Sequence, residues 1–169
     1  LMPLTLILTR HAKSSWGDPT RDDFDRTLND RGRRSADAIG AWLTKNGHLP
    51  DLVLVSGARR TVETWSRMAH HCPKTSEMAS NPALYLASAQ TIFGVLRTQT
   101  APSLMVICHN PGIADFAQRI TSAPHPHPRF DDYPTGATAI IRFDAPAWSE
   151  LDWATGQVTD FIVPRDLIP

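Results

Sequence analysis

The chain has few cysteines, no excess of charge of either sign and no long apolar run. Cys72 and Cys108 are too few for the disulfide framework of a small secreted domain. The 17 Lys and Arg residues balance 17 Asp and Glu residues, which argues against a nucleic-acid-binding protein that works by general charge. No apolar segment approaches the roughly 20 residues that cross a bilayer. We therefore expect neither a nucleic-acid partner nor a membrane partner.

A secretory leader, with a charged segment before an apolar one, is also missing, so the expected location is cytoplasmic. A chain of 169 residues predicts a single domain, residues 1–169. Such a domain buries roughly 70% of the surface of its unfolded chain, enough for a real core. No long exposed apolar stripe demands a partner, and we expect a monomer.

Short apolar runs alternate with amphipathic segments along most of the chain. The runs have the length of strands that are buried on both faces, and the segments between them have helical periodicity. The predicted strands are 4–8, 52–55 and 104–107, and the predicted helices are about 31–45, 58–71, 88–99 and 112–121. Asp30 is the expected N-cap of the first helix. This alternation predicts a largely parallel sheet between two helical layers.

The C-terminal part of the sequence departs from this alternation. Ala137–Phe143 and Gln157–Val163 are both rich in β-forming residues, and no long helix separates them. We expect them to pair antiparallel. The predicted fold is α/β, a three-layer α-β-α arrangement around a mostly parallel mixed sheet with an antiparallel C-terminal strand pair.

Chemically informative residues follow three of the predicted strands. Arg10-His11 follows the first, Ser56 with Arg59 or Arg60 follows the second, and His109-Asn110 follows the third. Open α/β sheets bind ligands at the carboxyl ends of their strands. A guanidinium can hold an anion through two parallel hydrogen bonds, and a neutral imidazole can attack it. Each pair alone could be an incidental loop charge, but three such strand ends together predict an anion site.

The ordered set of motifs resembles the histidine phosphatase superfamily, whose fold is phosphoglycerate mutase-like. The resemblance rests on Arg10-His11, Arg31-Gly32, Ser56 with Arg59, and His109-Asn110-Pro111-Gly112. Within the superfamily, the pattern resembles that of the small phosphohistidine phosphatases of the SixA type. That likeness covers nearly the whole chain and includes the segments 10–16, 23–32, 84–85, 134–135 and 164–167.

The resemblance implies a catalytic set of His11 as nucleophile, with Arg10, Arg59 and His109 as the phosphate pocket. The chemistry of these residues agrees with that assignment. The guanidinium groups would offset charge on the phosphoryl oxygens, and a protonated His109 would add a donor. His11 must be neutral, and a hydrogen bond from its other ring nitrogen to a backbone carbonyl would select the tautomer. Neither a metal ion nor a cofactor is needed.

The residues that border the predicted pocket are expected to bind the substrate. We place Lys13, Ser14, Trp16 and Arg21 at its entrance and Asn110 beside it. The expected partner is a phosphorylated protein that carries phosphohistidine, or a small phosphoester. Phosphate or sulfate should also occupy the pocket.

The leaving group separates these substrate classes. An ester oxygen leaves badly without a general acid, whereas the nitrogen of a phosphoramidate accepts a proton readily. Larger superfamily members supply a carboxylate shortly before the region that matches Leu84-Tyr85. Glu77 is the only acid near that place here, on a short strand and out of reach. An acid could instead come from the loop that holds Asp18, Asp22, Asp23 and Asp25.

The function predicted from the sequence is therefore removal of phosphate from phosphohistidine on a protein, through a covalent phosphohistidine at His11. Two alternatives stay open: a phosphatase of small phosphomonoesters from the same superfamily, and a phosphate-binding module without catalysis. Retention of two histidines argues against the second alternative, because binding alone needs only the arginines.

Two other features have plainer interpretations. His125 and His127 lie in a proline-rich loop, and without Cys or carboxylate ligands at matching spacing they do not indicate a metal site. Cys108 takes the place where SixA-like sequences usually carry glycine, and we expect a small buried residue rather than a reactive thiol.

Overall fold

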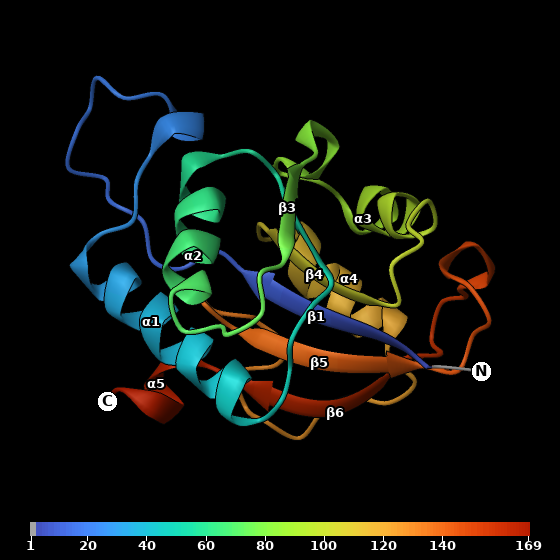
Figure 1. Ribbon diagram of the computed structural model, residues 1–169. Coiled ribbons are helices and arrows are strands. Elements are labelled where there is room, and N and C mark those ends of the chain that lie inside the picture. Colours follow the sequence, from blue (N-terminus) through green and yellow to red (C-terminus); the bar gives the residue numbers. More distant parts are fainter. Residues whose placement is uncertain (1–2) are drawn as a thin grey trace.

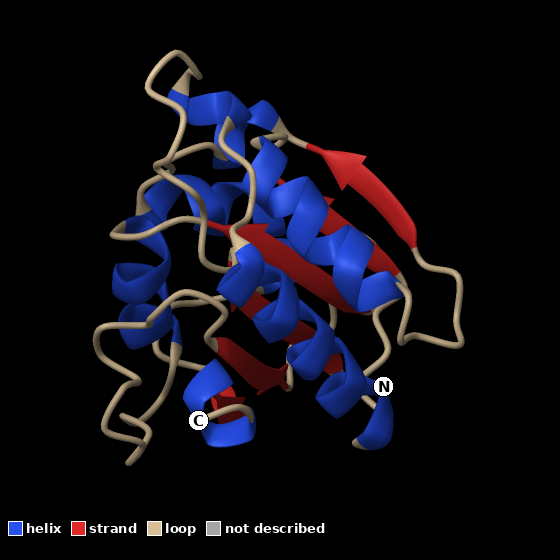
Figure 2. Ribbon diagram, turned by 90° about the vertical axis from the view of Figure 1, so that its left-hand side faces the viewer, coloured by secondary structure: helices blue, strands red, loops and turns tan. Residues whose placement is uncertain are grey.

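A computed structural model, which describes residues 3–169, contains one six-stranded sheet between two layers of helices (Figures 1 and 2). The strand order is β3-β2-β4-β1-β5-β6. β1, β2, β3 and β4 run parallel, and β5 and β6 form the antiparallel end. The strands are β1 (Leu4–Arg10), β2 (Leu52–Val55), β3 (Glu77–Ser80), β4 (Ser103–Cys108), β5 (Thr138–Phe143) and β6 (Gln157–Ile162). The predicted fold class is confirmed.

The helices divide between the two faces of the sheet. α1 and α2 pack on one face over a core that includes Ile39, Met68 and Met105. α3 and α4 pack on the other face over a larger core that includes Phe116 and Trp148. The helices are α1 (Asp30–Lys45), α2 (Arg59–Ala69), α3 (Ala89–Leu96), α4 (Gly112–Ile120) and α5 (Pro164–Leu167). No helix within residues 3–169 is long and apolar enough to cross a membrane.

Most differences from the predicted elements lie at their ends. The N-cap of α1 is Asn29 and not Asp30, because the Asn29 side chain accepts a hydrogen bond from the Gly32 amide at 2.8 Å. The predicted helices 58–71 and 88–99 are shorter in the structure, the predicted strands 4–8 and 104–107 are each longer by two residues, and strand 52–55 has the predicted bounds. The short helix α5 was not predicted, because four residues carry too little periodicity.

Parallel register brings the ends of three strands together. Arg10 of β1 lies opposite Cys108 of β4, and Val55 of β2 lies opposite Ile107. The residues that follow these strands therefore emerge at one edge of the sheet. The amide of Gly136 donates to the carbonyl oxygens of Arg10 and His11 at 3.1 and 3.0 Å. The segment before β5 thus closes this edge from the antiparallel side.

Gly32 allows α1 to approach this edge closely. A Cβ at this position would lie 2.0 Å from the carbonyl oxygen of Lys13. Only glycine allows the first turn of α1 to press against the segment after β1. This contact explains why glycine follows Arg31 in the motif, and it brings Arg31 near the loop of Lys13.

Candidate active site

His11 lies immediately after β1 and is 6% exposed. Its Nδ1 lies 2.7 Å from the carbonyl oxygen of Ala12. A carbonyl can only accept, so Nδ1 carries the proton and Nε2 has the free lone pair. Arg60 Nε donates to that lone pair at 3.4 Å. The backbone hydrogen bond expected from the sequence is present, and it leaves Nε2 as the unprotonated ring nitrogen.

Arg60 connects the two imidazoles. Its side chain is 3% exposed, and Nη2 lies 3.3 Å from Nδ1 of His109. Its Nη1 donates to the backbone carbonyl of Asp23 at 2.7 Å, and Nη2 lies 3.1 Å from Oδ2 of the same residue. The rings of His11 and His109 have their centroids 5.3 Å apart. One guanidinium is therefore held between the two rings and one carboxylate.

The structure corrects the prediction that Arg59 belongs to the pocket. Arg59 is the first residue of α2, and its side chain is 64% exposed beside Glu63 on the outer helix face. Arg60 is one residue further along, so it is turned by about 100° around the helix onto the face of Thr64 and Met68. The arginine that points into the site is thus Arg60, which lies four residues after Ser56 and four residues before Thr64. Helical spacing from Met68 and Thr64 was the signal that could have identified it.

The side-chain hydroxyl groups of Ser56 and Thr64 form hydrogen bonds that fix the surroundings of the two imidazoles. Thr64 Oγ1 accepts from the Ala12 amide at 3.0 Å and donates to the Arg60 carbonyl at 2.6 Å. Ser56 Oγ lies 2.7 Å from Nε2 of His109. Because Arg60 can only donate to Nδ1 of His109, Nε2 carries the proton and donates to Ser56. The tautomer and orientation of His109 are therefore set from both sides.

Arg10 lines the site from the end of β1. Its Nη1 donates to the carbonyl oxygen of Tyr133 at 3.3 Å. Its Nε is buried without a hydrogen-bond partner among residues 3–169. Leaving a buried donor unsatisfied costs about 1–3 kcal/mol. An anion that accepted from Nε would remove this cost, so the geometry of Arg10 suits an anion.

Asp23 is a site residue that the sequence left among four candidate acids. It accepts hydrogen bonds from the Tyr85 hydroxyl and from Arg26 Nη1, the latter at 2.8 Å, besides those from Arg60. The hydroxyl of Tyr85 lowers the pKa of Asp23 most, and with Arg26 and Arg60 it brings that pKa to about 2. Asp23 is therefore a carboxylate at neutral pH. It holds Arg60 in place and has no proton to donate.

Burial lowers the pKa of both imidazoles to about 3. Around His11 the smaller contributions in the same direction come from His109, Arg60 and Arg10, while the Ala12 carbonyl opposes them. Around His109, Arg60 lowers the pKa and Asp23 raises it. His11 is thus neutral at physiological pH, as attack requires. A doubly negative phosphoryl group would oppose the shift at His109 and favour its protonated form.

A cavity of about 340 Å³ opens over these residues. Lys13, Ser14, Trp16 and Asn110 line it, as placed from the sequence. Arg21 does not: its guanidinium lies 3.8 Å from Asp18 and 3.5 Å from the Thr27 hydroxyl instead. The walls carry four cationic side chains and one carboxylate, which suits an anion; these are Arg10, Lys13, Arg26, Arg60 and Asp23.

Trp16 forms part of the exposed rim of the cavity. It is 78% exposed, and the guanidinium carbon of Arg26 lies 3.3 Å from its ring centre. Arg26 is itself held by Ser14, by the Ser15 carbonyl and by Asp23. Trp16 is thus a rim residue and not part of the core.

Cys108 is fully buried at the end of β4, and burial raises the pKa of its thiol to about 12. A protonated, inaccessible thiol does not react, so the structure supports a packing role. Within residues 3–169, no three His, Cys, Asp or Glu side chains are grouped so that they could hold a metal ion. His127 instead lies 3.0 Å from Asp166.

Comparison with known proteins agrees with these features. The family model of the histidine phosphatase superfamily (branch 1) matches residues 6–84. An uncharacterised chloroplastic protein of Arabidopsis thaliana is 32% identical over 129 residues, 70% of this chain and 59% of that protein. An uncharacterised protein of Mycobacterium leprae is 28% identical over 174 residues, 92% of this chain and 99% of its own. The chain thus spans 59% of the length of the first relative and nearly all of the second.

Solved structures with the same fold cover almost the whole chain. A candidate phosphohistidine phosphatase SixA of Nakamurella multipartitia has a TM-score of 0.78 at 27% identity, over 96% of both chains. The protein histidine phosphatase SixA complexed with tungstate has a TM-score of 0.79 at 19% identity, over 97% of this chain and 99% of its own. A phosphoglycerate mutase of Plasmodium falciparum has a TM-score of 0.63 at 19% identity, over 95% of this chain and 91% of its own. The family model over residues 6–84, the shared fold and the motifs at the strand ends agree, and the chain is similar to members of the histidine phosphatase superfamily.

Proposed function

We propose that this protein removes the phosphoryl group from phosphohistidine on a protein, through a covalent phosphohistidine at His11. The observation that carries the proposal is a neutral, oriented Nε2 of His11 at the base of a cationic cavity with an apolar rim. The neutral Nε2 in a cationic cavity supports nucleophilic attack on a phosphoryl group. The apolar rim supports a protein substrate.

The reaction has two steps. Nε2 of His11 attacks phosphorus, a new N–P bond forms, and the N–P bond to the substrate imidazole breaks with its electron pair left on that nitrogen, which takes up a proton. Water then attacks phosphorus, the bond to His11 breaks, and inorganic phosphate leaves. The donors of Arg60 now directed at His11 and His109 would turn to the phosphoryl oxygens, and Arg10 would add its Nε. Such donors stabilise the charge that develops in the transition state.

The carboxylates near the site do not provide a general acid. Asp23 is ionised, and its oxygens are occupied by Arg60, Arg26 and Tyr85. Glu77 is exposed at the start of β3, opposite Leu52, whereas the site lies at the other end of these strands. An imidazole leaving group needs such an acid less than an alkoxide does. The carboxylate arrangement therefore favours a phosphoramidate over an ester.

Exposed apolar side chains around the cavity favour a protein substrate. Large apolar residues that are exposed within residues 3–169 are Trp16, Phe24, Met78 and Leu86, and three of them gather at this site. Trp16 and Leu86 line the cavity, and the ring of Phe24 packs edge-on against Tyr85 with centroids 5.0 Å apart. Leu86 also has a positive φ of 48°, a strained conformation that persists where the surroundings impose it. A small sugar phosphate would not need this rim.

The test is a substrate panel on the wild-type chain and on His11→Ala. The panel contains a phosphohistidine protein, free phosphohistidine, phosphoserine and a sugar phosphate. We expect the highest kcat/KM on the phosphohistidine protein and loss of turnover by about a thousandfold or more in His11→Ala, since a nucleophile is removed. Faster hydrolysis of either ester at saturation would make the protein a phosphomonoesterase.

A trapping experiment separates catalysis from simple binding. Brief incubation with ³²P-labelled substrate and acid-free denaturation should leave a base-stable, acid-labile adduct on the wild type and none on His11→Ala. Phosphate binding without any adduct would identify a binding module and overturn the proposal.

A further inference from the structure

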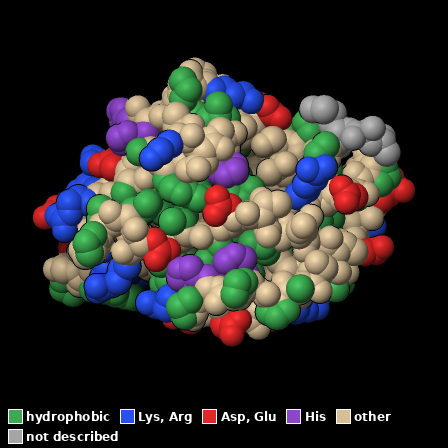
Figure 3. Space-filling model, turned by 90° about the horizontal axis from the view of Figure 1, so that it is seen from below, with side chains coloured by type: hydrophobic (Ala, Val, Ile, Leu, Met, Phe, Trp, Pro, Cys, Tyr) green, Lys and Arg blue, Asp and Glu red, His purple; other side chains and the backbone are tan. Residues whose placement is uncertain are grey.

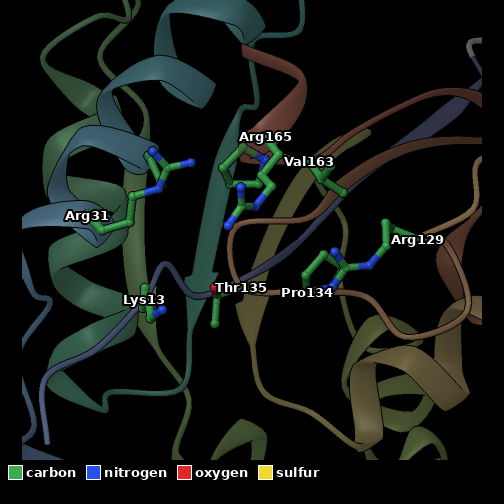
Figure 4. Close-up of a pocket in the computed structure, with 9 residues that line it drawn as sticks. Lys13, Arg31, Arg129, Pro134, Thr135, Val163 and Arg165 are labelled. Carbon is green, nitrogen blue, oxygen red and sulfur yellow. The ribbon is translucent and has the colours of Figure 1, made fainter. Parts of the chain in front are cut away.

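A second cavity, of about 270 Å³, lies beside the proposed active site (Figure 4). It is lined by Lys13 from the loop after β1, Arg31 from α1, Arg165 from α5 and Arg129 from the loop before β5. No carboxylate is among its lining residues. We call this cavity, with its four cations, the basic cavity. None of the residues of the proposed chemistry lies in it.

The basic cavity borders the active-site cavity directly. Lys13 and Thr135 line both. Thr135 precedes Gly136, whose amide donates to the carbonyl oxygens of Arg10 and His11. Figure 4 shows the side chains of Lys13 and Thr135 at the same end of the basic cavity. One substrate molecule can therefore extend from His11 past Thr135 into the basic cavity.

The cations of this cavity are largely unneutralised. Lys13, Arg31 and Arg165 have no carboxylate within 4.0 Å among residues 3–169, while Arg129 is paired with Asp132 at 2.9 Å. Arg31 is oriented by its hydrogen bond to the carbonyl oxygen of Ile168 at 2.6 Å. On the face that Figure 3 shows, by comparison, basic and acidic side chains are interspersed. Like charges gathered in a concave site repel one another, and a bound anion relieves that repulsion.

We propose that the basic cavity is a second anion-binding site, which receives an acidic side chain of the same protein whose phosphohistidine reaches His11. Arg165 and Arg31 hold a carboxylate through their guanidinium groups, and Lys13 contributes a point charge between the two cavities. The proposal deepens the proposed function and depends on it. A phosphohistidine beside Asp or Glu is then preferred to the same group in neutral surroundings.

The experiment compares two phosphohistidine peptides that differ only in replacement of Asp and Glu by Asn and Gln near the phosphohistidine. We expect the acidic peptide to have a KM about five- to twentyfold lower, the range of one or two exposed ion pairs of about 1 kcal/mol each, with kcat similar. Arg165→Met should remove this preference and leave turnover of free phosphohistidine unchanged. Arg34→Met is the matched control, an exposed arginine of α1 outside both cavities.

Reversal of the charge at residue 165 distinguishes recognition of the acidic side chain from a structural effect of the substitution. Arg165→Glu should reverse the preference, so that a peptide with Lys in place of the acidic residues becomes the better substrate. Equal KM values for the acidic and neutral peptides on the wild type would overturn the second site while leaving the proposed function intact. Failure to hydrolyse any phosphohistidine, free or peptide-bound, would instead overturn the proposed function.

The source of the anion is tested in the same assay. Inorganic phosphate and pyrophosphate are added as competitors to the wild type and to Arg165→Met. If the second site takes a carboxylate of the substrate, Arg165→Met changes the inhibition constant of phosphate little. A large loss of pyrophosphate inhibition in Arg165→Met, together with no peptide preference, would point to a small bisphosphorylated ligand and overturn the proposal.

Discussion

The two neighbouring cavities are both cationic, but they hold their charges in different ways. In the active-site cavity, Arg60 is buried and is connected to His11, His109 and Asp23. In the basic cavity, Arg165 is exposed and has no such partner among residues 3–169. The first arrangement keeps donors in one geometry before the substrate arrives, which is what transition-state stabilisation requires. The second leaves long side chains free to adapt, which is sufficient for recognition.

This difference suggests how to distinguish catalytic from binding arginines in such a fold. A catalytic arginine needs a carboxylate and buried neighbours that direct it, since a misplaced donor loses much of its effect. An arginine that only binds an anion needs to lie near that anion and to have few carboxylates that compete for its guanidinium. Variants that keep the charge but change its geometry should therefore affect the two cavities unequally.

The largest effect is expected at Arg60. Arg60→Met should reduce kcat/KM by about 100- to 1000-fold, equivalent to about 2.7–4 kcal/mol of lost transition-state stabilisation. Arg59→Met, its exposed neighbour on α2, should stay within about twofold, as for other exposed ion pairs. Steady-state kinetics on phosphohistidine measures both variants, and thermal unfolding confirms that both are folded. Equal losses would contradict the assignment of Arg60.

A smaller effect is expected from the carboxylate that directs Arg60. Asp23→Asn should reduce kcat by about 10- to 100-fold with little change in KM, since hydrogen bonds to charged groups contribute about 1.5–3 kcal/mol. Asp22→Asn alters an exposed neighbour outside the cavity and is the control. Asp23 is a positioning residue, so phosphate should still bind to Asp23→Asn. Loss of the alkaline limb of the pH profile in Asp23→Asn would instead show that Asp23 acts as a proton donor, because that limb reports a group that must be protonated.

The buried imidazoles should make the protein sensitive to acid. The pKa of His11 is about 3 in the folded chain and about 6.5 when unfolded, so the unfolded state binds more protons between these values. The free energy of unfolding should therefore fall as the pH decreases below about 6.5, by up to about 2 kcal/mol at pH 5 from His11 alone. Denaturant unfolding at several pH values measures this, and His11→Ala should give a shallower slope. NMR signals of a protonated His11 at pH 5 would contradict the prediction.

The smallest effect is expected for a substitution that preserves charge in the basic cavity. Arg165→Lys should keep the preference for an acidic peptide within about twofold, since a point charge is sufficient at an exposed, adaptable site. Raising the salt concentration from about 0.05 to about 0.5 M should weaken the preference, because exposed charges are screened. Arg60→Lys, in contrast, should lose most of its activity. If Arg165→Lys is as damaging as Arg165→Met, the basic cavity requires fixed geometry, and the contrast between the cavities is wrong.

Much of the fold and part of the site followed from local patterns in the sequence. Apolar runs predicted the central strands, and parallel pairing placed the residues after them at one edge of the sheet. That rule was enough to bring Arg10, His11 and His109 together, because it depends only on strand direction. The rotation of α2 was less evident, because adjacent helix residues point about 100° apart and the motif alone did not show which arginine faces inward, and Arg59 was selected instead of Arg60.

The amino-acid sequence by itself determined the order of strands and helices and the chemistry at the strand ends, because these depend on periodicities of a few residues. Only the tertiary structure selected Asp23 from four loop acids, turned Arg60 inward and gathered Lys13, Arg31, Arg129 and Arg165 around one cavity. Those outcomes depend on contacts between segments far apart along the chain. No local periodicity records them, since they arise when the loops pack against a sheet already formed.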